Sequence, residues 1–112
     1  MPKEFDRMTE SVEENLPAVQ ERFAQYNKEF FPERSPEFFC LELCGEAGEL
    51  ANLEKKIWKG KDIEFDRLAD EAADVFIALV NYANARGIEL SRAVADKLAR
   101  IEEKRARKEE KD

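Results

Sequence analysis

Histidine is absent from the 112-residue chain. Hydrolases that use histidine as a general base are therefore excluded, and so are the Glu-x-x-His di-iron sites of helical bundles. Cysteine is limited to Cys40 and Cys44. Four residues apart on one helix, the two are poorly placed for a mutual disulfide, and we expect buried thiols. Two cysteines without histidine also leave too few ligands for a structural zinc site.

Glycine and proline are scarce as well, with four residues of each. The glycines do not have the spacing of a phosphate-binding P-loop or of a dinucleotide-binding turn. No apolar run is long enough for a membrane span, and the first residues lack the apolar region of a signal peptide. We therefore expect a cytoplasmic protein that contacts no membrane. The net charge of −7 argues against binding to nucleic acid polymers, because that binding depends on a basic surface.

The composition favours a small helical protein. Hydrophobic residues make up 43% of the chain and charged residues 40%, and no segment alternates like a strand. We predict an all-α fold, a helical bundle of about four helices. The single domain is expected over residues 15–104, between a polar lead-in at 1–14 and a charged tail at 105–112. Its small size and broad apolar faces favour assembly as a homo-oligomer.

Capping residues divide the chain into four expected helices. Ser35 suits the N-cap of the second helix and Ser91 that of the fourth, while Gly60 and Gly87 suit the C′ positions of the second and third. The expected helix ranges are about 17–31, 36–59, 65–86 and 91–101. On the first helix the residues expected to face the core are Val19, Phe23, Tyr26 and Phe30.

Acidic residues share one stripe of the second helix. Glu42, Glu46 and Glu49 lie within about 60° of one another at helical spacing. On the third helix, Glu71 and Asp74 are three residues apart and also point to one side. Apolar positions flank both sets, so these carboxylates are expected at the edge of a core. A charge there is costly unless something neutralises it.

Two glycines interrupt the acidic helix. Gly45 and Gly48 each destabilise a helix by roughly 1 kcal/mol relative to alanine. We therefore expect a close approach to this backbone, either by a neighbouring helix or by a ligand.

The two acidic pairs suggest a metal site. If the second and third helices pack side by side, Glu46 and Glu49 converge with Glu71 and Asp74 into a cage of oxygen ligands. Such a cage suits hard divalent cations, with Mg²⁺ the expected ion and Mn²⁺ a substitute. Mg²⁺ is commonly completed by substrate phosphates, and a nearby carboxylate is able to orient or deprotonate a water. The competing interpretation is a solvated acidic face without a ligand.

The segments GEAGEL at 45–50 and DEAADV at 70–75 resemble the Glu-x-x-Glu and Glu-x-x-Asp signature of the MazG-like family, all-α nucleoside triphosphate pyrophosphohydrolases. The resemblance implies Mg²⁺-dependent hydrolysis of a (d)NTP to the (d)NMP and pyrophosphate, in nucleotide pool cleaning or supply. It implies metal ligation by Glu46, Glu49, Glu71 and Asp74, and we assign catalysis to Glu46 and Glu49. It also implies a homodimer or tetramer in which helices of more than one chain approach the pocket.

Substrate contacts are expected on several helices. Lys97 followed by Leu98 matches the basic motif of the family's last helix, with Arg100 and Lys104 on the same face, whereas Val94 replaces the usual asparagine. Asn81 is a candidate substitute, and Glu42 a candidate outer carboxylate. The candidate walls for a base are Phe23, Tyr26, Phe38, Phe39 and Trp58, although Trp58 also suits a subunit contact.

The leading hypothesis is therefore an enzyme, a nucleotide pyrophosphohydrolase. The alternative is a non-catalytic helical module that binds nucleotide or serves as an oligomeric scaffold. Convergence of the acids separates the two, because a scaffold does not need its carboxylates on facing sides of two helices. The sequence leaves the base and the sugar open.

Overall fold

The computed structural model describes residues 2–111. Within that range the chain forms four helices and no strand, which confirms the all-α prediction: α1 (Lys3–Phe30), α2 (Pro36–Trp58), α3 (Phe65–Arg86) and α4 (Leu90–Lys111). None of these helices combines the length and the apolar character that crossing a membrane requires.

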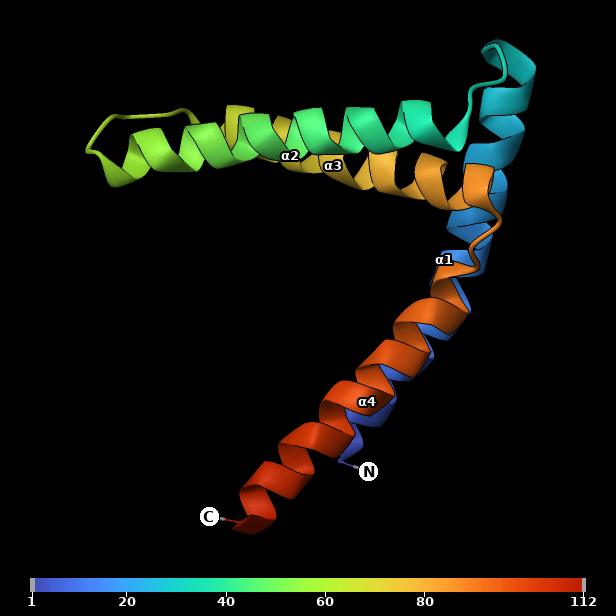
Figure 1. The fold of residues 1–112 in the computed structure, drawn as a ribbon, viewed down its shortest axis with the longest axis vertical. Helices are drawn as coiled ribbons and strands as arrows, with labels where there is room; N and C mark the ends of the chain where they lie inside the picture. The colour runs from blue at the N-terminus through green and yellow to red at the C-terminus, as the bar shows by residue number, and fades with distance from the viewer. Residues whose placement is uncertain (1, 112) are drawn as a thin grey trace.

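The helices are arranged as two antiparallel pairs (Figure 1). One arm consists of α2 packed along α3, and the other of α4 packed along the N-terminal part of α1. The arms meet at a corner where α1 contacts α3. The molecule is consequently open, with extents of 48 × 42 × 22 Å.

Several helix ends follow the expected capping chemistry. The Ser35 hydroxyl accepts a hydrogen bond of 3.2 Å from the backbone N–H of Phe38, as an N-cap does. Gly60 and Gly87 adopt φ values of +91° and +78°, which glycine tolerates without strain. These three predictions are confirmed.

The outer ends of α1 and α4 differ from the sequence expectation. Helix α1 begins at Lys3 rather than near Pro17, which lies inside it, and α4 continues to Lys111 rather than ending near Ile101. Residues 3–14 of the expected lead-in and residues 105–111 of the expected tail are therefore helical. The reason is mutual packing, since half-buried positions recur at helical spacing on both helices. These positions include Phe5, Val12 and Leu16 on α1 and Leu98, Glu102 and Ala106 on α4.

The start of α4 depends on a residue from another helix. Ser91 was expected as its N-cap, but the helix begins at Leu90, so that prediction is wrong. The Leu90 N–H instead donates to Oε1 of Gln20 over 2.7 Å. The Gln20 Nε2 group donates to Oδ1 of Asn84 and to the carbonyl of Ile88, each over 2.9 Å. One glutamine on α1 thereby ties together α3, the short connection and α4 at the corner.

The fully buried core is small and lies almost entirely in one arm. Its four residues are Leu53, Ala78, Val80 and Ala83, from α2 and α3. The expectation that Tyr26 and Phe30 face the core is wrong, because their exposed fractions are 58% and 63%. They lie near the C-terminal end of α1, which projects past the α2/α3 arm (Figure 1). There Tyr26 packs against Phe30 and Phe31, with ring centroids 5.3 and 5.7 Å apart.

The face of α2 opposite α3 is uncovered. Cys40 and Cys44 are exposed there, so the expected burial of the thiols is wrong. A Cβ added at Gly45 or Gly48 meets no atom within 4 Å, so no other helix of this chain approaches these glycines. Approach by a ligand or by a second chain stays a prediction.

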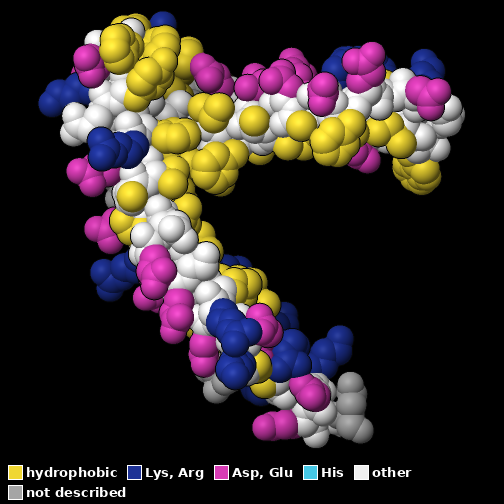
Figure 2. Space-filling model, turned by 180° about the vertical axis from the view of Figure 1, so that it is seen from behind, with side chains coloured by type: hydrophobic (Ala, Val, Ile, Leu, Met, Phe, Trp, Pro, Cys, Tyr) yellow, Lys and Arg dark blue, Asp and Glu magenta, His cyan; other side chains and the backbone are white. Residues whose placement is uncertain are grey.

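Large apolar side chains remain at the surface. Among the most exposed are Leu41 at 74%, Phe65 at 78% and Trp58 at 89%. Figure 2 shows hydrophobic side chains gathered along the inner side of the angle between the arms. Apolar surface of this extent on a small chain is typical of a surface that another molecule covers.

Candidate active site

The acidic residues lie in the seam between α2 and α3. Glu46 and Glu49 continue at spacings of three and four residues into the buried Leu53, and Glu71 and Asp74 continue likewise into the buried Ala78. The carboxylates therefore occupy the packing stripe itself, rather than a stripe beside it. Packing of α2 on α3 brings the two stripes face to face.

Three carboxylates converge at this seam. Glu46, Glu49 and Glu71 each offer an oxygen, and the three oxygens lie within 4.8 Å of one another. Glu46 and Glu71 are half-buried, whereas Glu49 is exposed. Oε2 of Glu71 is buried, and no hydrogen-bond donor of residues 2–111 reaches it. A buried carboxylate oxygen in this state needs either a proton or a cation.

The titration of the cluster follows from this crowding. The negative charge of Glu71 is the main cause that raises the pKa of Glu49, and burial and the charge of Asp74 add to it. Burial is the main cause that raises the pKa of Glu71, and the charges of Glu46 and Asp74 add to it. Without a cation, Glu49 and Glu71 therefore hold a proton more readily than ordinary carboxyl groups do.

Asp74 stands at the edge of the cluster. It is outside the three-residue group, yet its charge contributes to the raised pKa of both Glu49 and Glu71. The donor set contains only carboxylate oxygens, which hard divalent cations prefer to imidazole or thiolate. A cation would also satisfy the orphaned oxygen of Glu71. The residues present therefore fit Mg²⁺ or Mn²⁺.

Lys56 is a residue of this seam that sequence reasoning did not assign to the site. It is half-buried, while every other described lysine is exposed. It follows Glu49 by seven residues, two helical turns, on the same face of α2. That spacing was the signal available in the sequence.

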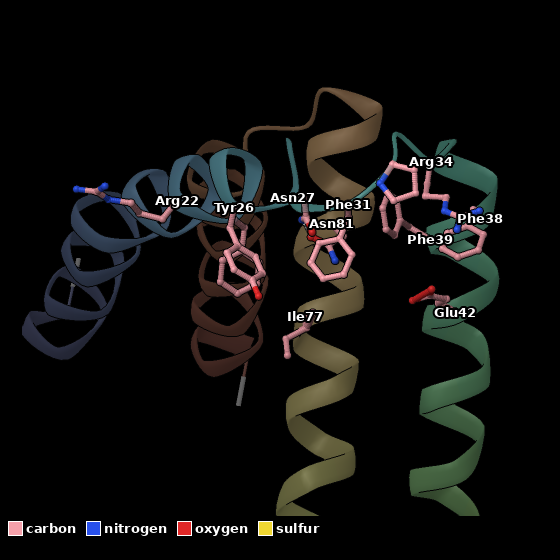
Figure 3. Close-up of a pocket in the computed structure, with 12 residues that line it drawn as sticks. Arg22, Tyr26, Asn27, Phe31, Arg34, Phe38, Phe39, Glu42, Ile77 and Asn81 are labelled. Carbon is pink, nitrogen blue, oxygen red and sulfur yellow. Dashed lines mark hydrogen bonds between the residues drawn. The ribbon is translucent and has the colours of Figure 1, made fainter. Parts of the chain in front are cut away.

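An apolar pocket of about 690 Å³ opens beside the cluster, toward the corner of the molecule (Figure 3). Its polar members come from α1, the α1–α2 connection, α2 and α3, and the amide of Asn27 donates to Oδ1 of Asn81 over 2.7 Å. The lining residues are Arg22, Phe23, Tyr26, Asn27, Phe31, Pro32, Arg34, Phe38, Phe39, Glu42, Ile77 and Asn81.

The pocket and the cluster share the same two helices. Glu42 precedes Glu46 by one turn, about 6 Å along the axis of α2. Ile77 and Asn81 follow Asp74 on α3 by three and seven residues. Because α2 and α3 are antiparallel, the pocket directly continues the seam.

Some expected substrate residues meet here and others do not. Glu42 and Asn81 line the pocket, as do Phe23, Tyr26, Phe38 and Phe39. Trp58 ends α2 at the far tip of the arm and is 89% exposed, away from the pocket. Sequence reasoning missed Phe31 and Arg34, which the turn after α1 brings inward. Residues in such a connection carry no periodic signal, although connections often carry function.

The expected basic residues lie on the other arm. Lys97, Arg100 and Lys104 belong to α4, and all three are exposed. Helix α4 packs on α1, and it diverges from the α2/α3 arm (Figure 1). Within one chain, these cations and the acidic cluster are therefore not brought together.

Comparisons of the chain with protein-family models, with curated proteins and with solved structures give no match.

Proposed function

We propose that this protein is a Mg²⁺-dependent nucleoside triphosphate pyrophosphohydrolase, which cleaves a (d)NTP to the (d)NMP and pyrophosphate. The observation that carries the proposal is the convergence of Glu46, Glu49 and Glu71, of which Glu71 has a buried and unpartnered Oε2. The sequence resemblance to MazG-like enzymes agrees with it. Nucleotide pool cleaning or supply is the corresponding role.

Each acid has a part in this proposal. Glu46, Glu49 and Glu71 would hold the metal ion, with Asp74 completing or positioning the set. The ion, when bound, supplies positive charge against the triphosphate oxygens and acidifies a bound water. Glu49 is the most exposed of the three and has a raised pKa, so its carboxylate suits accepting a proton from the attacking water. Glu46 shares its face of α2 and would orient that water.

The pocket provides a place for the rest of the nucleotide. With the phosphates at the seam, the base reaches the aromatic walls formed by Phe23, Phe38 and Phe39, one helical turn away. Aromatic walls stack on a base face, and polar groups at the rim select its edge. Lys56, on the opposite side of the cluster, is in position to approach the terminal phosphates.

A second copy of the chain completes the proposed site. The inner faces of both arms carry exposed apolar side chains, which suit burial against another copy (Figure 2). Such an arrangement would bring Lys97, Arg100 and Lys104 of one copy toward the phosphates bound by the other. A homodimer, or a tetramer built from dimers, is therefore part of the proposal.

The proposal is tested by measuring pyrophosphate and orthophosphate released from canonical and modified NTPs and dNTPs, with Mg²⁺ and with EDTA. Metal-dependent pyrophosphate is expected, and Glu49→Gln should lower the turnover rate by roughly 10²-fold or more. Glu54→Gln is the matched control, since Glu54 is an exposed glutamate of the same helix. Binding without pyrophosphate release would instead identify the non-catalytic nucleotide-binding alternative.

A further inference from the structure

One wall of the pocket carries opposite charges around a phenyl ring. Arg34 precedes α2, and its Cζ lies 4.7 Å from the centroid of the Phe38 ring. Glu42 follows Phe38 by one turn and lines the same pocket. Figure 3 shows these side chains on one wall, with the Glu42 carboxylate pointing toward α3. The wall therefore offers hydrogen-bond donors and acceptors next to an aromatic face.

Neither charged group is neutralised within the described chain. None of the ion pairs among residues 2–111 includes Arg34 or Glu42. The amides of Asn27 and Asn81, by contrast, already bond to each other. Arg34 and Glu42 therefore both keep hydrogen-bonding capacity for a ligand, as does Arg22 on α1.

The two groups have complementary and restricted chemistry. A carboxylate only accepts hydrogen bonds, and a guanidinium only donates them in a planar fork. A planar ligand that satisfies both must place two adjacent donors beside two adjacent acceptors. Guanine does so, since its N1–H and N2–H neighbour each other and are followed by O6 and N7.

The other bases match less well. Adenine offers one donor group beside the N1 acceptor, and cytosine one donor group beside the N3 acceptor, so one carboxylate oxygen of Glu42 would face a lone pair. In uracil and thymine, carbonyl oxygens flank the single N–H on both sides. A facing lone pair costs a carboxylate more than a missing contact, because the lone pair and the negative charge repel each other.

We propose that the pocket selects guanine, with Glu42 accepting from N1–H and N2–H and Arg34 donating to O6 and N7. The inference rests on the proposed function, which places the base in this pocket. The cavity of about 690 Å³ has room for the two-ring base, and Phe23 and Phe39 line the same pocket as stacking surfaces. The substrate class is then GTP or dGTP.

The test separates base recognition from hydrolysis. GMP, IMP, AMP, CMP and UMP are titrated calorimetrically into the full chain in EDTA, so that binding depends neither on metal nor on turnover. GMP should bind about tenfold or more tightly than IMP, which lacks only the 2-amino group. In Glu42→Gln, GMP and IMP should bind within about threefold of each other, whereas Glu54→Gln should keep the wild-type preference.

Each outcome decides the proposal. Equal binding of the five monophosphates, tighter binding of CMP, or a GMP preference unchanged in Glu42→Gln would overturn it. Pyrophosphate release from a different nucleotide would also overturn it while leaving the enzyme proposal standing. A Glu42-dependent GMP preference without any pyrophosphate release would support it and remove the enzyme proposal. Arg34→Lys provides a second test. Loss of the planar guanidinium fork should weaken the binding of GMP more than the binding of AMP.

Discussion

Glu49 of α2 and Glu71 of α3 face each other across the helix seam with carboxylate oxygens within 4.8 Å. Like charges at this separation oppose the packing of the two helices that carry them. The arrangement therefore weakens the metal-free fold and favours the fold with a bound cation. In the proposed enzyme, this contact would couple stability to function.

The first prediction concerns pH. The pKa of both Glu49 and Glu71 is higher in the folded state than in the unfolded chain. In the pH window between the ordinary carboxyl pKa and the raised pKa, the folded state therefore binds more protons than the unfolded chain. Across that window these two groups make the metal-free protein less stable as pH rises. Glu49→Gln should raise the melting temperature in EDTA at neutral pH and flatten its pH dependence. An unchanged melting temperature relative to Glu54→Gln would contradict the repulsion argument.

The second prediction concerns metal. A cation held by the cluster should stabilise the fold by about 2.7 kcal/mol when its concentration reaches a hundredfold its Kd. Melting of the wild type should therefore shift upward with Mg²⁺ or Mn²⁺, and the shift should disappear in Glu71→Gln. The Glu54→Gln control should shift like the wild type. Equal shifts in all three proteins would show that the ion binds elsewhere.

The third prediction concerns Lys56. A half-buried ammonium that meets a phosphate makes a charge-assisted contact, so Lys56→Ala should raise KM by roughly tenfold or more. Lys55→Ala changes an exposed lysine one position earlier and should leave KM close to the wild-type value. Initial rates over a range of nucleotide concentrations measure both. Similar KM values for the two variants would place Lys56 outside the site.

The fourth prediction concerns the core. Leu53 is only 3% exposed, so Leu53→Ala should lower the free energy of unfolding by about 2–5 kcal/mol. Urea denaturation measures the loss, with the 74% exposed Leu41 changed to alanine as the comparison. A Leu53→Ala protein as stable as the wild type would mean that the α2/α3 seam does not support the fold.

The fifth prediction concerns the second copy. Glu49→Gln and a Lys97→Ala, Arg100→Ala double variant should each be nearly inactive alone. If the α4 cations act on the partner's cluster, an equal mixture of the two variants, after subunit exchange, should recover about a quarter of wild-type activity in a dimer. Half of the dimers would then be mixed, with one intact site of two. No recovery in a mixture shown to exchange would place all these residues within one chain.

Structural features that depend only on neighbouring residues were predicted correctly from the sequence. The Ser35 cap and the left-handed Gly60 and Gly87 follow from backbone rules that act over a few positions. The pairing of acids at spacings of three and four follows from helix geometry alone. These features needed no knowledge of how the helices pack.

Features that depend on contacts between helices could not be predicted from the sequence. The helical start at Lys3 requires α4 alongside it, and the start of α4 at Leu90 requires Gln20 from a helix distant in sequence. Exposure of Cys40 and Cys44 likewise follows from the single face of α2 that α3 covers.

For the candidate site, the sequence by itself determined which acids could converge, because helical periodicity fixes the face on which each side chain lies. The tertiary structure alone decided that Glu46, Glu49 and Glu71 do converge, since that depends on the register of α2 against α3. It also decided that Arg34 shares a pocket with Glu42, and that the α4 cations lie on the other arm. Register and the angle between the arms arise from contacts between residues far apart in the chain, which no local pattern encodes.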